Sequence, residues 1–151
     1  DERRQPAPAH IAAPAALQYA LLGQGEGVAE LREMFENLLV ASMDSDTASS
    51  AHPAFVSMIQ QLTPDEARIL KSINRNEYPY TDLRRSGSFR TTLGIDAEID
   101  GTRQQQYVSN LERLGILRMV PVDTLTGSGG VLVVTPLGRQ FLDTCVCVRA
   151  R

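Results

Sequence analysis

Apolar residues in the segment 28–43 recur at intervals of three and four positions, which is the period of an amphipathic helix. The apolar stripe consists of Leu31, Met34, Phe35, Leu38, Leu39 and Met43. Three glutamates lie largely off the stripe, and turn-forming residues follow at 44–47. The pattern therefore predicts a helix over 28–43 with one buried face.

Shorter helices are predicted on either side of this one. The first covers 10–22 and begins near Pro14, and a glycine-rich stretch ends it. The other covers 53–61, where Pro53 suits the first turn. We expect Phe55 to pack into the stripe of the long helix, as the ridges of one helix fit the grooves of another.

The next segment opens with capping signals. Thr63 can cap a helix N-terminus, Pro64 suits the first helical position, and Glu66 completes a capping box. These residues predict a helix that runs from there to about residue 72 or 74.

The pattern is mixed beyond that helix. Residues 75–101 are irregular, with one short helical turn expected at 81–85. A clear helix follows over 102–114, and Gly115 is a good C-terminal stop.

The period then changes from helical to β-branched runs. Residues 116–122 and 131–134 have strand character, and the stretch 123–130 between them is predicted to form the tip of a hairpin. Thr135 and Pro136 start a last helix. The order helix, turn, helix, strand, tip, strand, helix is that of a winged helix.

Two sequence phrases carry the same resemblance. Residues 110–117 (NLERLGIL) and 134–141 (VTPLGRQF) resemble winged-helix regulators at the points where a helix meets the wing and where the wing returns into the last helix. The resemblance covers 102–142 well and 63–101 loosely. It bears on the fold and not on DNA binding, because one fold hosts many functions.

We therefore predict a mainly α-helical protein with a small β-hairpin, in which a helical bundle is followed by a winged-helix-like module. Residues 1–9 are predicted to be a linker or a disordered start. Residues 10–61 are predicted to form a helical subdomain, and residues 62–151 the winged-helix-like module.

Composition and charge narrow the functional classes. Apolar residues make up 42% of the 151 positions, which is enough for a core without metal or disulfide support. The net charge of −3 argues against a protein coated in positive charge. However, residues 62–151 hold twelve bases and ten acids, whereas residues 1–61 hold three bases and eight acids. An anionic partner would therefore meet the C-terminal half. The sequence has no apolar run long enough to span a membrane.

Candidate nucleic-acid-binding residues lie in the predicted helix 102–114 and in the segment before it. They are Arg84, Arg85, Arg90, Arg103, Gln104, Gln105 and Asn110. The arginines suit phosphates, and the residues of the helix suit base edges. The same side chains can equally be the solvated face of an amphipathic helix. We favour that second interpretation, because Glu112 and three acids at 96–100 share the stretch.

No sequence pattern indicates catalysis, a cofactor or a metal ion. Cys145 and Cys147 lack the further cysteine or histidine ligands of a zinc site. The glycines at 23–27 lack the preceding strand and the following Lys-Ser/Thr pair of a phosphate loop. We expect His52 to be a cap or turn residue. The prediction is a non-enzymatic protein with no cofactor, in a reduced cytoplasmic setting.

A second resemblance rests on residues 10–17 (HIAAPAAL), 30–44 (ELREMFENLLVASMD) and 52–70. These segments resemble the bacterial Abi-alpha family, a group associated with abortive infection against phage. The match covers roughly the whole chain and is most specific over 30–70. It implies phage defence by halting the infected cell, and it brings no catalytic residues. The family is longer at its N-terminus and the chain starts without methionine, so we expect a piece of a longer protein.

Three functions stay open from the sequence. The favoured one is a defence component that acts as a non-enzymatic recognition or assembly domain. Its partner would be a protein, phage-derived or a self partner, and a homo-oligomer is one form of this. The second is a DNA-binding transcriptional regulator that uses residues 102–114. The third is a toxin or nuclease whose active residues lie outside this fragment.

Overall fold

Helices dominate the computed structural model, which describes residues 4–23, 27–72, 81–82, 101–122 and 129–146. These residues form two compact units. One comprises the residues up to Ala67 together with those from Gln140, and the other comprises Arg68–Arg139. The division differs from the predicted segments, since the boundary falls after Ala67 and the C-terminal helical residues belong to the first unit. The mainly helical fold with a small antiparallel hairpin is confirmed.

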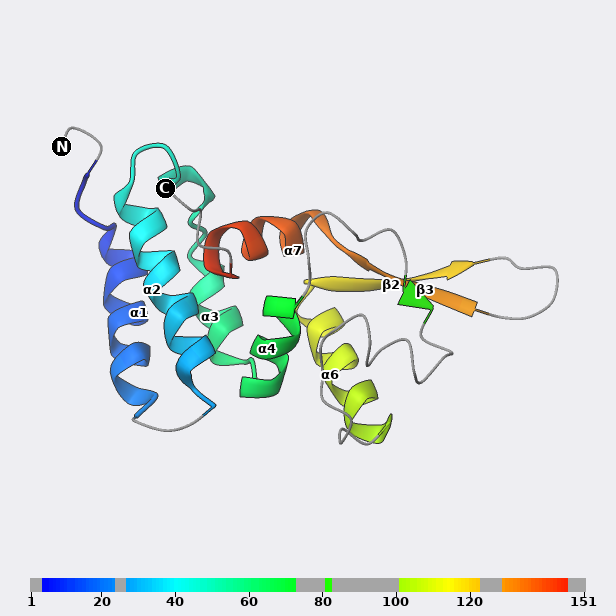
Figure 1. Ribbon diagram of the computed structural model, residues 1–151. Coiled ribbons are helices and arrows are strands. Elements are labelled where there is room, and N and C mark those ends of the chain that lie inside the picture. Colours follow the sequence, from blue (N-terminus) through cyan, green and yellow to red (C-terminus); the bar gives the residue numbers. More distant parts are fainter. Residues whose placement is uncertain (1–3, 24–26, 73–80, 83–100, 123–128, 147–151) are drawn as a thin grey trace. The chain divides into compact units, whose positions relative to one another are not determined.

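The first unit is built on three helices. They are α1 (Ala9–Leu21), α2 (Ala29–Met43) and α3 (Ala54–Gln60), and a short 3-10 turn at Ala48–Ser50 lies between α2 and α3. Figure 1 shows α1 and α2 side by side and running in opposite directions. The C-terminal π-helical turn Leu142–Val146 packs against α2 and closes the unit.

The predicted stripe of α2 is the centre of this unit. Leu31, Met34, Phe35 and Leu38 are all buried, and Phe55 of α3 is fully buried among the core residues. The predicted contact between α2 and α3 is therefore confirmed. Burial of these apolar side chains is the main force that holds the helices together.

The structure departs from two predictions at the start of the chain, the point where the first helix begins and the linker at 1–9. Pro14 lies inside α1 and does not begin it, because the helix already starts at Ala9 on a turn closed by the Pro8 carbonyl. Pro14 is the sixth of the thirteen residues of α1 and has no N–H to donate to the His10 carbonyl, so one intrahelical hydrogen bond is missing at this point of the helix. Before α1, the backbone N–H of Gln5 donates to the carbonyl of Met43 at 2.8 Å, so this part of the predicted linker is held against the end of α2.

The capping box is present at the start of α4 (Pro64–Ser72). The Thr63 N–H donates to the Glu66 carboxylate at 2.7 Å, and the Glu66 N–H donates to the Thr63 hydroxyl at 3.2 Å. Only 2% of Glu66 is exposed, so this carboxylate is a buried part of the helix start.

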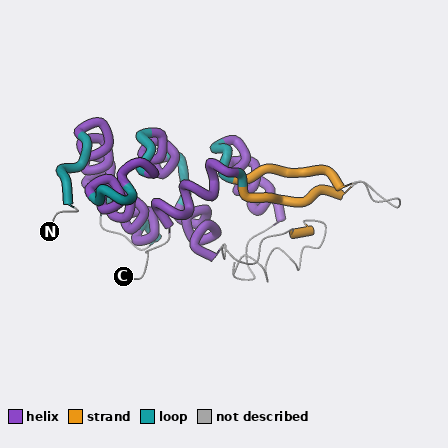
Figure 2. Tube along the Cα trace, turned by 90° about the horizontal axis from the view of Figure 1, so that it is seen from above, coloured by secondary structure: helices purple, strands orange, loops and turns teal. Residues whose placement is uncertain are grey.

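The second unit contains a three-stranded antiparallel sheet in the order β1-β3-β2. Strands β2 (Leu117–Val122) and β3 (Gly129–Val134) form the predicted hairpin, with Leu117 opposite Val134. Figure 2 shows them as two orange tubes that run side by side. Strand β1 (Thr81–Asp82) pairs with β3, which corrects the helical turn expected at 81–85, at least over these two residues. Of the predicted hairpin tip at 123–130, residues 123–128 lie outside the described residues, and Gly129 and Gly130 are not part of a tip but pair with β2 as the start of β3.

Helix α6 (Gly101–Arg113) leads into the hairpin through a tight junction. Gly115 ends the helix with φ +73°, a conformation that other residues adopt only with strain. The Thr135 hydroxyl donates to the Gly115 carbonyl and accepts a hydrogen bond from the Gly138 N–H, which caps α7 (Pro136–Phe141). A Cβ at Gly138 would overlap the Ile116 carbonyl, so glycine is required there. The assignment of this unit as a winged helix stays a prediction.

Candidate functional site

Two exposed helix surfaces, one in each unit, are the candidate binding surfaces among the described residues. The first is the outer side of α6 in the second unit. The inner side of α6 is marked by its buried residues Val108 and Leu111, which are 8% and 1% exposed. The side opposite to them therefore faces outward. Among the side chains of α6 that the structure describes, the exposed ones are Arg103, Gln105, Gln106, Ser109 and Arg113.

The polar groups of α6 are partly engaged within the helix and its neighbour strand. Both Nε and Nη2 of Arg113 donate to the side-chain oxygen of Asn110, at 3.1 and 2.6 Å. The Met119 N–H of β2 donates to the Glu112 carboxylate at 2.7 Å. Glu112 therefore anchors the hairpin to the helix, and its charge is directed to the backbone of β2.

The candidate nucleic-acid-binding residues differ in their exposure and in whether the structure describes them. Arg103 and Gln105 are exposed as expected, whereas Asn110 is half-buried and accepts the two hydrogen bonds from Arg113. The side chain of Gln104 lies outside the described part of the chain. So do the three remaining candidates, Arg84, Arg85 and Arg90. The sequence analysis did not single out Gln106 or Ser109, although their spacing from Leu111 places them outward.

The second surface is the outer side of α1 in the first unit, which we call the α1 apolar face. Its members are exposed and uncharged: Ala13, Ala16, Leu17, Ala20 and Leu21. Leu17 is 58% exposed and Leu21 is 68% exposed. The opposite side of α1 is buried at Ile11 and Ala15. A surface helix usually carries polar residues outward, so α1 presents an unusual apolar surface.

Polar contacts attach one flank of α1 to α2. The Tyr19 hydroxyl donates to the Glu36 carboxylate at 2.8 Å, and the Arg32 guanidinium lies 5.4 Å from the centre of the Tyr19 ring. Arg32 also donates to the carbonyl of Gly23, just beyond the end of α1. The hydrogen bond to Glu36, and then the negative charge of Glu36, raise the pKa of Tyr19. Leu17 and Leu21 are two positions from Tyr19, about 200° around the helix, so they point away from this flank.

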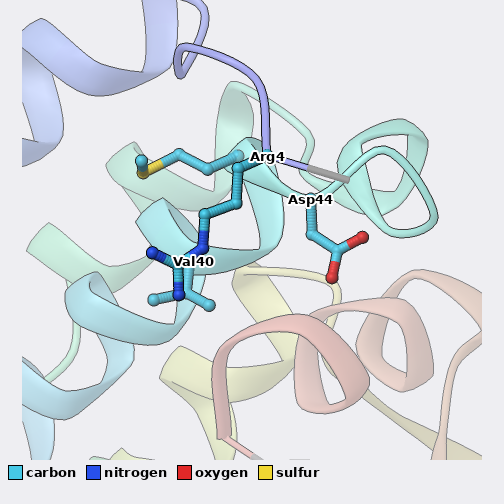
Figure 3. Close-up of a pocket in the computed structure, with 4 residues that line it drawn as sticks. Arg4, Val40 and Asp44 are labelled. Atoms are coloured by element: carbon cyan, nitrogen blue, oxygen red, sulfur yellow. The ribbon is translucent and has the colours of Figure 1, made fainter. Parts of the chain in front are cut away.

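A shallow hollow lies at the other end of α2. It is lined by Arg4, Val40, Met43 and Asp44, and Val40 and Met43 are exposed apolar residues. Figure 3 shows the Arg4 side chain lying over Val40, while the carboxylate of Asp44 points away from the guanidinium. The backbones of Arg4 and Asp44 form a β-bridge that holds the chain start in this position.

Reactive residues elsewhere are in structural positions. The Cys145 thiol is fully buried, and burial raises its pKa above the ordinary thiol range. The His52 ring accepts a hydrogen bond from the Ala54 N–H at 3.1 Å, which confirms its predicted role as a turn residue before α3. Within the described ranges, no cluster of three or more metal-ligating side chains forms, and no helix has both the length and the apolar character needed to cross a membrane.

Sequence reasoning did not identify the α1 apolar face. The available signal was the composition of 9–21, which contains no acidic residue, lysine or arginine. This composition alone does not identify an exposed face, because alanines and leucines on both sides of a helix do not reveal which side is covered.

Comparison with known proteins gives one match. The model of a family described as Abortive infection alpha matches residues 1–145, which is nearly the whole chain. Searches among curated proteins and among solved structures found no match.

Proposed function

The chain belongs to the abortive infection alpha family, and on this premise we propose that it serves phage defence as a non-enzymatic recognition unit that binds a protein partner. The α1 apolar face is the contact surface. The partner is a phage-encoded protein or a protein of the host cell. The observation that carries the proposal is the exposure of Leu17 and Leu21 on a helix without a charged residue.

The surface has the composition that protein contacts use. Cores of protein–protein interfaces are poor in charged residues and have a polar rim. The α1 apolar face has no acid, lysine or arginine. The contacts of Tyr19 with Arg32 and Glu36 hold the other side of α1 to α2 and leave this face uncovered. Alanines allow a partner to approach the helix closely, while the two leucines supply the larger apolar side chains.

The expected energies are sufficient for a measurable effect. Full burial of a leucine side chain is worth about 1.5–3 kcal/mol, and these two are already partly covered, so each would contribute about 1–2 kcal/mol to binding. Each 1.4 kcal/mol corresponds to about a tenfold change in affinity. Loss of both leucine contacts should therefore weaken binding by about a hundredfold.

The test is a pull-down with tagged protein from phage-infected and uninfected cells, with nuclease treatment to remove partners bridged by nucleic acid. The double variant Leu17→Glu with Leu21→Glu places two carboxylates on the α1 apolar face. Ser57→Glu with Gln60→Glu is the matched control, because it adds two carboxylates at exposed positions of α3 in the same unit.

We expect a nuclease-resistant partner with the wild-type protein and the α3 control, and its loss with the α1 variant. Equal recovery by all three proteins would exclude the α1 apolar face as the contact. Turnover of nucleic acid or nucleotide by the purified protein would contradict the non-enzymatic role.

A further inference from the structure

The two units carry opposite charge. Residues 1–67 and 140–151 together hold eleven acids and five bases, a net charge of −6. Residues 68–139 hold seven acids and ten bases, a net charge of +3. The overall charge of −3 therefore conceals a basic second unit, and an anionic ligand would be drawn to that unit.

The outer side of α6 has a regular arrangement of polar residues. Arg103, Gln106, Asn110 and Arg113 follow one another at intervals of three, four and three positions, so they form a single stripe on the helix. The two arginines at its ends are ten residues apart, or about 15 Å along the helix axis. We call these four residues the α6 stripe.

The stripe contains no acid, and the single acid of α6 is used elsewhere. Glu112 accepts the hydrogen bond of the Met119 N–H, which directs its carboxylate to β2. Its position is also about 100° or more around the helix from each member of the stripe. The repulsion that Glu112 would exert on an anion at the stripe is therefore reduced by its placement.

We propose that the α6 stripe binds the major groove of duplex DNA. The B-form major groove is about 12 Å wide and admits an α-helix. The separation of about 15 Å between the two end arginines lets Arg103 and Arg113 reach the phosphates that border the groove. Gln106 lies between them and faces the base edges, where a glutamine can pair with adenine.

The geometry selects DNA over duplex RNA. The major groove of A-form RNA is deep and narrow, and side chains on a helix do not reach its base edges. Contacts to phosphates alone would not distinguish the two duplexes, whereas insertion of α6 would. The proposal concerns a different surface from the α1 apolar face and stands independently of it.

The test is fluorescence anisotropy of a labelled duplex DNA of random sequence, titrated with the protein at several salt concentrations. Arg103→Gln with Arg113→Gln removes the two end cations. Arg118→Gln with Arg139→Gln is the matched control, since it removes two exposed cations of the same unit that lie outside the stripe. A duplex RNA of the same sequence serves as the competing ligand.

We expect wild-type binding that weakens with salt, and a slope of log affinity against log salt that falls by about two in the α6 variant, since each phosphate contact contributes about 0.9. The slope of the control variant Arg118→Gln with Arg139→Gln should differ from the wild-type slope by less than about half of that change. The RNA duplex should bind at least about tenfold more weakly than the DNA.

Equal loss in the α6 variant and the control would overturn the proposal in favour of unspecific charge attraction. Equal affinity for RNA and DNA would also overturn it, as would the absence of wild-type binding at low salt. Because Arg113 bonds Asn110, a second variant, Gln106→Glu, leaves both arginines and that bond in place and should also weaken binding. The Leu17→Glu and Leu21→Glu protein should bind DNA as the wild type does, which separates this result from the test of the protein partner.

Discussion

Phe55 of α3 and Phe141 of the C-terminal α7 meet edge to face, with ring centres 5.3 Å apart and ring planes at 89°. Both side chains are fully buried. The contact joins two residues 86 positions apart in the sequence. It is supported by hydrogen bonds from Gln140 and Thr144 to the Ser50 carbonyl, at 3.2 and 3.3 Å. The C-terminal helical residues are thereby part of the core of the first unit.

Phe55→Ala should lower the free energy of unfolding by about 3–5 kcal/mol, because it removes a buried aromatic ring and leaves a cavity. The change is measured by chemical denaturation monitored by circular dichroism. Phe55→Leu should cost less, since it keeps much of the volume. A loss below about 1 kcal/mol for Phe55→Ala would contradict the place of this ring in the core.

Thr63→Ala should destabilise the protein by about 1 kcal/mol through loss of the side-chain cap on α4. Thr63→Ser keeps the hydroxyl and should restore most of the stability. Thermal melts of the two variants give the comparison. If serine and alanine destabilise equally, the 3.2 Å hydrogen bond from the Glu66 N–H to the Thr63 hydroxyl does not stabilise the helix.

Gly138→Ala should destabilise the junction between α6, the hairpin and α7 by about 1–3 kcal/mol or more, because its methyl group would overlap the Ile116 carbonyl. Arg139→Ala, at an exposed position of the same helix, serves as the control. Hydrogen exchange of β2 and β3 would locate the effect. Unchanged exchange in the hairpin would show that the junction accommodates the added methyl group.

Cys145 should make the stability of the protein depend on pH in the alkaline range. Burial raises its pKa in the folded state above the unfolded value of about 8.5. Above that pH the unfolded thiol loses its proton while the folded thiol keeps it, so the free energy of unfolding falls as the pH rises. Cys145→Ala should show a shallower decline between neutral and alkaline pH in denaturant titrations. If the free energy of unfolding falls equally with pH in the wild type and in Cys145→Ala, the pKa of the Cys145 thiol is not raised in the folded state.

Thiol reactivity gives a separate check on the same residue. In a Cys147→Ser background, Cys145 is the single remaining cysteine. We expect the native protein to react slowly with a thiol reagent and the unfolded protein to react fast, because a protonated, buried thiol is a poor nucleophile. Equal rates would show that Cys145 is accessible in the native state.

Local signals in the sequence predicted much of the fold. The Thr63 and Glu66 capping box and the Gly115 helix stop depend on a few neighbouring residues and are found as predicted. The α2 stripe is buried from Leu31 to Leu38 as predicted, whereas Leu39 is half-buried and Met43 is exposed. The short strand β1 was not predicted, because two residues give no alternation and their strand structure comes from pairing with β3. Likewise, the return of Phe141 to the first unit depends on a long-range contact that no local pattern encodes.

The candidate site was harder to predict than the fold. From the sequence alone, Glu112 argues against an anionic ligand at α6. Its hydrogen bond with the Met119 N–H forms only in the folded hairpin, so the sequence does not show that its carboxylate is directed to β2. Exposure of Leu17 and Leu21 could not be read from the pattern either, because α1 is apolar on both sides and its covered side is decided by α2 and α3. The tertiary contacts of a helix determine which apolar side is left for a partner.

The most direct test of the central claim is a plating assay in cells that express the protein and are challenged with a phage that the wild-type protein restricts. Leu17→Glu with Leu21→Glu should abolish the protection, while the protein accumulates and melts as the wild type does. Ser57→Glu with Gln60→Glu should retain the protection. Full protection by the α1 variant would contradict the claim that the α1 apolar face binds the partner through which the protein acts in phage defence.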